Sequence, residues 1–242
     1  DSGGKMEKGD WRRDSMNKFI QELHKLVRRT KPTCKFGISP FGIYRPGEPK
    51  QVRVSLDAYS TLYSDVKLWW HKGWCDYLAP QLYWSTDHTQ YGFPGLYDWW
   101  RDENRRKRHL WPGIATYRIT TEKRSANESL RQVKITRDNN ELKYGTGHIH
   151  FSMKHLMDNV SNVNGILKNN VYNDVALIPE SPWLTSGRMP RADLRVVAET
   201  DVSLVLQWKA VPVDNRVKWW LLQTYEDGKW KTLKLVPKEV NN

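Results

Sequence analysis

The sequence holds only two cysteines, Cys34 and Cys75, and neither stands at a spacing from other cysteines or histidines that is typical of a metal site. It also lacks a glycine-rich turn of the kind that binds phosphate between a strand and a helix. We therefore expect no metal and no cofactor. Each cysteine precedes an expected strand, so a disulfide between parallel neighbours is conceivable, but two buried thiols are the interpretation we favour.

The sequence has no apolar run that approaches the roughly 20 residues a membrane-spanning helix needs, and we expect no membrane span. No signal peptide is visible, although the chain starts in Asp1-Ser2-Gly3-Gly4, a stretch typical of the inside of a loop. The hydrophobic content of 38% indicates a soluble protein.

The formal net charge of +12 is compatible with nucleic-acid binding. The basic clusters Arg12-Arg13, Arg28-Arg29 and Arg105 to Arg108 fall on separate expected helices, however, and separate clusters make no continuous groove for phosphates. We therefore favour solvated helix surfaces and expect no nucleic-acid partner. The 13 Trp and 11 Tyr are many for this length and indicate either a large core or flat faces on which sugars or bases stack.

The stretch from Trp74 to Trp84 is short, apolar and bounded by polar residues, as a buried strand is. Three further stretches, residues 34 to 39, 110 to 117 and 147 to 152, repeat this plan. Helices are expected between them, over about residues 57 to 71, around Trp99 and over residues 125 to 137. A first helix, from Asp10 onward, repeats apolar residues at the spacing of one face: Met16, Phe19, Ile20, Leu23, Leu26 and Val27. Strand-like stretches that alternate with helices, with no hairpin signal between them, predict an α/β fold with a parallel sheet.

The two faces of the expected strands differ in bulk, because side chains alternate along a strand. One face carries the larger residues: Phe36, Ile38, Leu78, Leu82, Ile114, Ile149 and Phe151. The other carries mostly smaller or polar residues: Gly37, Ser39, Ala79, Gln81, Gly113, Ala115, His150 and Ser152. An open sheet with helices on both faces would be bulky on both, so this pattern favours a closed barrel, of which four strands are half.

The composition changes after Pro182-Trp183-Leu184. Short strand-like stretches follow, and Glu226-Asp227-Gly228-Lys229 is a hairpin turn signal. We therefore expect a first domain over residues 1–185 and an incomplete, sandwich-like β domain over residues 190–242. Trp208 and one of Trp219 and Trp220 are expected between its sheets.

Several motifs, in this order, resemble the glycosyl hydrolase-like 10 family: Trp11-Arg12-Arg13-Asp14, Lys35 to Arg45, Tyr77 to Trp84, Trp111-Pro112-Gly113 and His148 to Lys154. The resemblance covers about residues 10 to 185. It implies that the four strands are the fifth to eighth, the C-terminal half, of a TIM (β/α)8 barrel, followed by a partial fibronectin-III-like β-sandwich. It also implies an exported bacterial protein, at an extracellular, periplasmic or cell-surface location, similar to the hydrolase domain of the poly-β-1,6-N-acetylglucosamine enzyme.

The same resemblance implies which residues face a sugar. The family's acidic signature is an Asp-Asp-Tyr run at the end of the fourth barrel strand, and this sequence does not contain it. We therefore expect the catalytic acids before Asp1 and assign none here. The sugar-facing rim carried over is Ser39, Arg45, Gln81, Tyr83, Trp84, Tyr117, Arg118 and Ser152.

Each rim residue also has a structural interpretation. Tyr83 and Trp84 serve equally well as a packed barrel top. The Gln81 amide can bond internally, and Arg118 can pair with an acid. His150 is expected to be a core histidine with satisfied hydrogen bonds. Neither Asp76, at the wrong end of its strand, nor Asp87, in a loop, makes a convincing catalytic acid.

The leading hypothesis is therefore a glycoside hydrolase that cleaves a bacterial or environmental polysaccharide, with amino-sugar polymers among the candidates. The alternative is a non-catalytic carbohydrate-binding protein that keeps the aromatic cleft. A polysaccharide or oligosaccharide is the expected partner in both.

Overall fold

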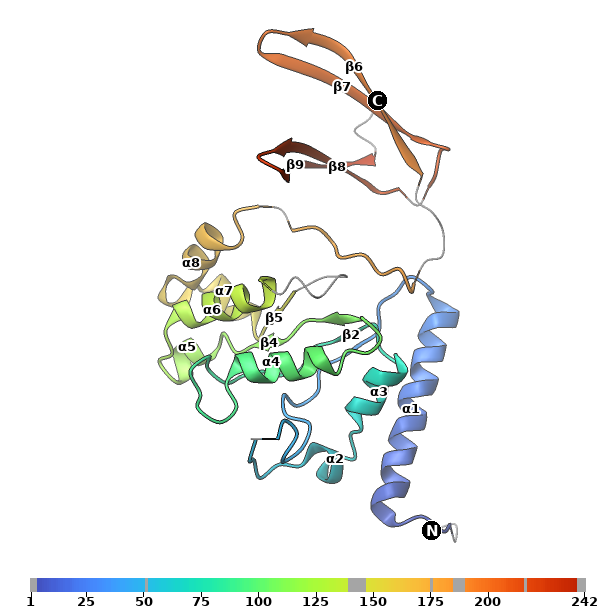
Figure 1. Ribbon diagram of the computed structural model, residues 1–242, viewed down its shortest axis with the longest axis vertical. Coiled ribbons are helices and arrows are strands. Elements are labelled where there is room, and N and C mark those ends of the chain that lie inside the picture. Colours follow the sequence, from blue (N-terminus) through green and yellow to red (C-terminus); the bar gives the residue numbers. More distant parts are fainter. Residues whose placement is uncertain are drawn as a thin grey trace. The chain divides into compact units, whose positions relative to one another are not determined.

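The computed structural model describes residues 4–50, 52–138, 147–174, 176–184, 190–215 and 217–238. The chain divides into two units, the first made of Asp1–Asn173 with Ile178–Thr185, the second of Asp174–Leu177 with Ser186–Asn242 (Figure 1). The change of unit lies close to the change in composition after Leu184. Each unit is described by itself.

The first unit is built on short parallel strands. β1 (Gly37–Ile38), β2 (Tyr77–Leu78) and β3 (His109–Leu110) pair in that order, and β4 (Gly113–Ile114) pairs with β5 (Ile149–His150). Parallel bridges from Gln81 to Phe41 and to Gly113 join the two ladders. Because β3 and β4 both belong to the third predicted strand, these five strands represent the four predicted ones, which are neighbours in chain order and all parallel. The predicted pairing is confirmed.

Helices separate the strands of this unit, except between β3 and β4, and the first helix precedes the first strand. They are α1 (Lys8–Thr30), α2 (Ala58–Thr61), α3 (Val66–Lys72), α4 (Phe93–Asp102), α5 (Arg118–Thr121), α6 (Ala126–Arg137), α7 (Met153–Met157), the 3-10 turn η1 (Val160–Asn162) and α8 (Val163–Asn170). Figure 1 shows α1 running beside α3, and α6 beside α8. Among the described residues, no helix combines the length and the apolar character that crossing a membrane requires.

The helix predicted over residues 57 to 71 is wrong in one respect, because two helices occupy it. Asp57 caps α2 by accepting from the Ser60 N–H, and Asp65 caps α3 by accepting from the Leu68 N–H. Between them Tyr63 has a φ of 54°, which no right-handed helix tolerates. Two competent N-caps in one apolar pattern therefore make two short helices. Gly73, at φ 69°, ends α3.

The register of the strands decides which side chains share a face, since directly paired residues of neighbouring strands point the same way. Ile38 pairs with Leu78 and Leu78 with Leu110, and these residues face the helices. Ile114 pairs with His150, and Gly113 with Ile149. His150 therefore lies on the helix side, while Ile149 and Phe151 lie on the opposite face. The face predicted for the fourth strand is wrong by one residue.

The core lies between the strands and the helices. Trp70, Tyr97 and Trp100 are fully buried in it, and the Trp100 indole donates to the carbonyl of Gly42 (2.8 Å). Much of the aromatic surplus therefore belongs to the core. Both cysteines are free: Cys75 is buried and Cys34 is exposed, so the favoured pair of buried thiols is correct only for Cys75.

The second unit consists of two antiparallel hairpins, β6 (Arg191–Thr200) with β7 (Ser203–Val211) and β8 (Trp219–Glu226) with β9 (Lys229–Pro237). Asp227 (φ 50°) and Gly228 (φ 76°) make the turn between β8 and β9, as the sequence predicted. Trp208 and Trp220 are half-buried and Trp219 is exposed, so Trp220 is the better candidate for a place between two sheets.

Candidate carbohydrate-binding face

The strand face opposite the core carries a hollow of about 180 Å³, whose lining includes Gly37, Tyr77, Tyr83, Gly113 and Phe151. Its two glycines make room for aromatic rings. A Cβ on Gly37 would lie 2.0 Å from the ring of Tyr77, and one on Gly113 would lie 3.1 Å from the ring of Tyr83. The small residues of the sequence pattern therefore let large rings lie flat against the strands.

Three aromatic residues, Tyr83, Tyr117 and Phe151, gather on this face and are called the aromatic triad here. Tyr83 and Phe151 are stacked, with ring centroids 5.9 Å apart and planes at 20°. Tyr117 meets both edge-on, at 6.0 and 5.8 Å, and its backbone N–H donates to the carbonyl of Phe151 (3.1 Å). Phe151 keeps 54% of its surface exposed, so the triad offers a free flat side.

The triad combines an apolar surface with phenol groups. Burial raises the pKa of Tyr83, and the neighbouring phenol of Tyr117 raises it further. Tyr83 therefore stays a neutral hydroxyl that both donates and accepts hydrogen bonds. Flat apolar rings bordered by hydroxyls match the two surfaces of a sugar ring, its C–H face and its hydroxyl edge.

The predicted rim residues divide into two groups. Ser39, Gln81, Tyr83 and Tyr117 lie on or beside the hollow face, although Ser39 donates to the carbonyl of Ala79 (2.9 Å) and Gln81 to that of Ser39 (3.3 Å). The bond from Gln81 is an internal hydrogen bond, the alternative to a sugar contact that the sequence left open.

Of the remaining rim residues, both arginines are paired with acids. Arg45 pairs with Asp57 (3.5 Å) and Arg118 with Glu122 (2.9 Å). Trp84 is half-buried and packs against the core. Ser152 precedes α7 as its N-cap residue and follows Phe151 on the strand whose face was misassigned. The triad residue that the sequence reasoning missed is Phe151.

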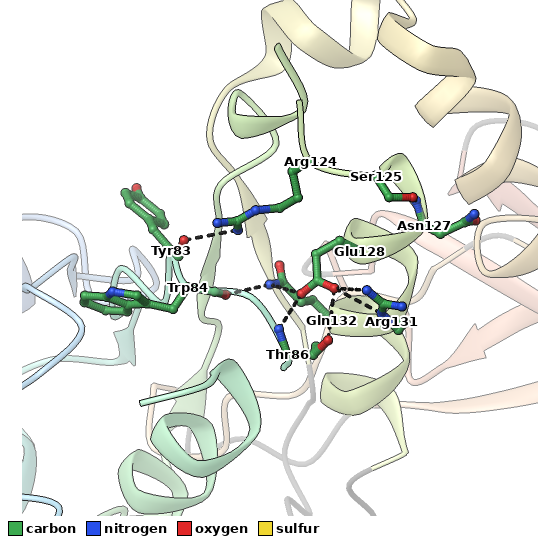
Figure 2. A network of polar contacts seen from close by, with 9 residues as sticks. All are labelled: Tyr83, Trp84, Thr86, Arg124, Ser125, Asn127, Glu128, Arg131 and Gln132. Carbon is green, nitrogen blue, oxygen red and sulfur yellow. Dashed lines mark hydrogen bonds and ion pairs between the residues drawn. The ribbon is translucent and has the colours of Figure 1, made fainter. Parts of the chain in front are cut away.

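Figure 2 shows how the segment after β2, which carries Tyr83 and Trp84, is tied to α6. Arg124 donates to the carbonyl of Tyr83 (3.2 Å), and Gln132 donates to that of Trp84 (2.9 Å). The backbone leading to the triad is thus fixed by side chains of α6 and of the loop before it.

At the centre of this network lies the buried carboxylate of Glu128. It accepts from the N–H (2.6 Å) and the hydroxyl (2.9 Å) of Thr86, from Gln132 (2.9 Å) and from Arg131 (2.6 Å). A carboxylate with this many donors holds the loop as a single rigid unit.

We expect Glu128→Ala to lower the free energy of unfolding by about 3 kcal/mol, because it leaves buried donors of Thr86 and Gln132 without a partner. Denaturant unfolding measures the loss. Glu122→Ala is the matched control, since Glu122 pairs with Arg118 and Arg124 at the surface and should cost below about 1 kcal/mol. Equal losses in the two variants would show that Glu128 has no special role.

The two carboxylates considered in the sequence do not lie at this face. Asp76 is fully buried and bonded to Arg28, the Phe36 N–H and the Trp183 indole. Asp87 is exposed, and a hydrogen bond from Ser85 lowers its pKa. None of the described residues that line the hollow carries a carboxyl group.

Behind the triad, on the core side of β5, a chain of hydrogen bonds fixes the strand. Thr116 lies 2.7 Å from Nδ1 of His150, whose Nε2 lies 2.8 Å from the hydroxyl of Tyr172. The same hydroxyl contacts Nε2 of His148, whose Nδ1 lies 3.3 Å from the hydroxyl of Thr136. His150 is thus the satisfied core histidine that was predicted, but on the opposite face from the one assigned to it.

The sequence profile of the glycosyl hydrolase-like 10 family matches residues 4–129, more than half of the 242 residues. The chain belongs to this family. The matched range contains Tyr83 and Tyr117, whereas Phe151 lies beyond it. The family resemblance drawn from the sequence motifs is confirmed.

Two named relatives extend the match. The chain is 32% identical over 236 residues to glycosyl hydrolase YngK of Bacillus subtilis (strain 168), which covers 93% of this chain and 46% of that protein. It is 31% identical over 121 residues to glycosyl hydrolase DigH of Escherichia coli (strain K12), covering 48% of this chain and 28% of that protein. The chain therefore spans less than half the length of these relatives.

Proposed function

We propose that the first unit forms one wall of the substrate cleft of a polysaccharide-cleaving glycosidase, with the aromatic triad as the surface on which a sugar ring stacks. The observation that carries the proposal is the stacked, half-open pair of Tyr83 and Phe151 at a hollow whose described lining comes from the strands and the segments that follow them. Membership of a glycosyl hydrolase-like family favours a hydrolase over a protein that only binds carbohydrate.

The proposal includes the barrel. Four parallel strands in chain order, with bulky residues toward the helices and glycines on the other face, fit the C-terminal half of a TIM (β/α)8 barrel. The triad residues follow β2, β4 and β5, at the carboxyl ends where barrel enzymes hold their sites. The two hairpins of the second unit fit a partial fibronectin-III-like sandwich in the same way.

In this proposal the first unit binds the sugar but does not provide the carboxyl groups that cleave it. Glycoside cleavage normally requires two carboxyl groups, one to protonate the leaving oxygen and one to act as base or nucleophile. The described lining of the hollow offers rings, backbone and hydroxyls instead. In this proposal Ser39, Gln81 and Tyr117 contribute polar contacts to the sugar, and Arg45 and Arg118 reach it only by leaving their acidic partners.

We expect Tyr83→Ala or Phe151→Ala to weaken binding of an oligosaccharide by about 1–3 kcal/mol, the usual scale for losing a good aromatic contact. Calorimetric titration with a panel of oligosaccharides, and a melting curve for each variant, is the measurement. Tyr83→Phe separates the hydroxyl from the ring.

Trp11→Ala is the control, since Trp11 is an exposed aromatic residue on α1. Unchanged sugar affinity together with a large fall in melting temperature would show that Tyr83 is a packing residue, and the proposed binding face would have to be abandoned.

A further inference from the structure

The second unit carries an exposed aromatic pair that the proposed function does not use. Tyr225 on β8 and Trp230 on β9 are directly paired across the hairpin, with ring centroids 5.1 Å apart and planes at 57°. Tyr225 is 62% exposed and Trp230 is 67% exposed. A cross-strand pair of this kind normally stabilises a sheet by packing, but here most of both rings remains free to contact a ligand.

The turn beside this pair places carboxylates next to the rings. Asp227 and Gly228 both have positive φ, as a two-residue turn that matches the twist of a hairpin requires. A pocket of about 610 Å³ adjoins the turn and is lined by Asp174, Glu226, Asp227, Trp230, Lys231 and Thr232. It therefore combines one large ring with three carboxylates, one ammonium and one hydroxyl.

We propose that this pocket is a second carbohydrate-binding site, which takes a neutral polysaccharide chain of the kind the enzyme degrades. Trp230 would lie against the C–H face of a sugar ring, while Glu226 and Asp227 accept hydrogen bonds from its hydroxyls. The proposal rests on the proposed function for the class of ligand, but the site itself is separate from the aromatic triad.

The charges of the pocket select among occupants. Three carboxylates face one lysine, so the pocket is locally acidic on a chain whose formal net charge is +12. Phosphates, nucleic acids and glycans rich in carboxyl groups would meet repulsion there. A neutral glycan meets none, and its hydroxyls supply the donors that carboxylates require.

Binding to two sites by the whole chain tests the proposal. Calorimetric titrations use neutral hexasaccharides of glucose and of N-acetylglucosamine, and an acidic hexasaccharide containing uronic acid. With a neutral probe we expect two binding events, of which Trp230→Ala weakens one about tenfold or more, as loss of a stacking ring does. Trp230→Phe should restore much of it.

Trp219→Ala is the matched control, because Trp219 is 53% exposed on the same hairpin but pairs with Pro237 at its other end. It should change neither event, and Tyr83→Ala should affect only the other one. If Trp230→Ala alone weakens binding and Tyr83→Ala does not, the second site stands and the proposed function fails. Unchanged binding in Trp230→Ala, preference for the acidic probe, or no binding of a neutral probe by the unaltered chain would overturn the second site.

Discussion

Lowering the pH from about 7.5 to about 4.5 should reduce the free energy of unfolding of the first unit by about 5 kcal/mol through two histidines alone. Burial lowers the pKa of His148 to about 3 and that of His150 to about 4. For His148 the neighbouring His150 and Arg137 add to the effect. Both groups thus take up a proton far more readily in the unfolded chain, where the pKa of histidine is about 6.5.

The sign follows from this difference. Above about pH 6.5 both histidines are neutral in the folded and in the unfolded state, so they do not change the free energy of unfolding with pH. As the pH falls from there toward the folded values, only the unfolded chain gains protons, and each histidine removes about 1.4 kcal/mol per pH unit. Protonation of both histidines would also place two positive charges close together, because the rings of His148 and His150 have centroids 5.2 Å apart.

Denaturant unfolding at several pH values measures the slope. The double variant His148→Gln/His150→Gln should be less stable at neutral pH but should lose stability more slowly as the pH falls. The same slope in the variant and in the unaltered chain would mean that these histidines do not titrate with unfolding.

The β/α order of the first unit was predictable because it depends on signals close together in the sequence. Short apolar stretches separated by helical periodicity, with no hairpin turn between them, leave parallel neighbours as the natural arrangement. Hairpin turns after residue 190 were equally local, and Asp227-Gly228 forms the expected turn. The start of α6 next to Ser125 was predicted closely, whereas Asp10, which was expected to open the first helix, lies inside α1, which begins at Lys8.

The face of β5 was not predictable from bulk. A polar residue such as His150 faces a core when distant partners satisfy it, and these partners lie 34 residues before it, in Thr116, and 22 after it, in Tyr172. Gly147 held the clue. A Cβ there would lie 2.7 Å from Trp111, so Gly147 makes room for a ring as Gly37 does. Because side chains alternate along a strand, Phe151 lies on the same face as Gly147.

Periodicity alone also overstated the buried face of α1. Of its apolar residues only Ile20 is buried, whereas Phe19 and Leu26 are exposed. A helical pattern shows which side of a helix is apolar, but packing decides how much of that side another element covers. Asp76 is a second residue whose role depends on packing. Its position at the start of a strand excluded a catalytic role, but it did not reveal the structural one.

Asp76→Ala should lower the free energy of unfolding by about 3–5 kcal/mol, the scale for breaking a buried ion pair. Its carboxylate is fully buried and joins three segments: Arg28 at the end of α1, the Phe36 N–H (2.7 Å) before β1, and the Trp183 indole (2.8 Å). Removing it takes away the charge partner of Arg28, whose Nη1 still donates to the carbonyls of Pro32 (2.9 Å) and Cys34 (3.1 Å), and it removes the acceptor of the Phe36 N–H.

A second variant separates the ion pair from the packing. Asp76→Leu combined with Arg28→Met replaces both charges by apolar groups and should recover part of the loss, because the guanidinium of Arg28 is then no longer left without its carboxylate. Chemical denaturation gives the energies, and titration with an oligosaccharide should give the same affinity in every folded variant, since Asp76 lies outside the hollow that holds the triad. A double variant as unstable as Asp76→Ala would show that the hydrogen bonds to the Phe36 N–H and the Trp183 indole, and not the ion pair, hold these segments together.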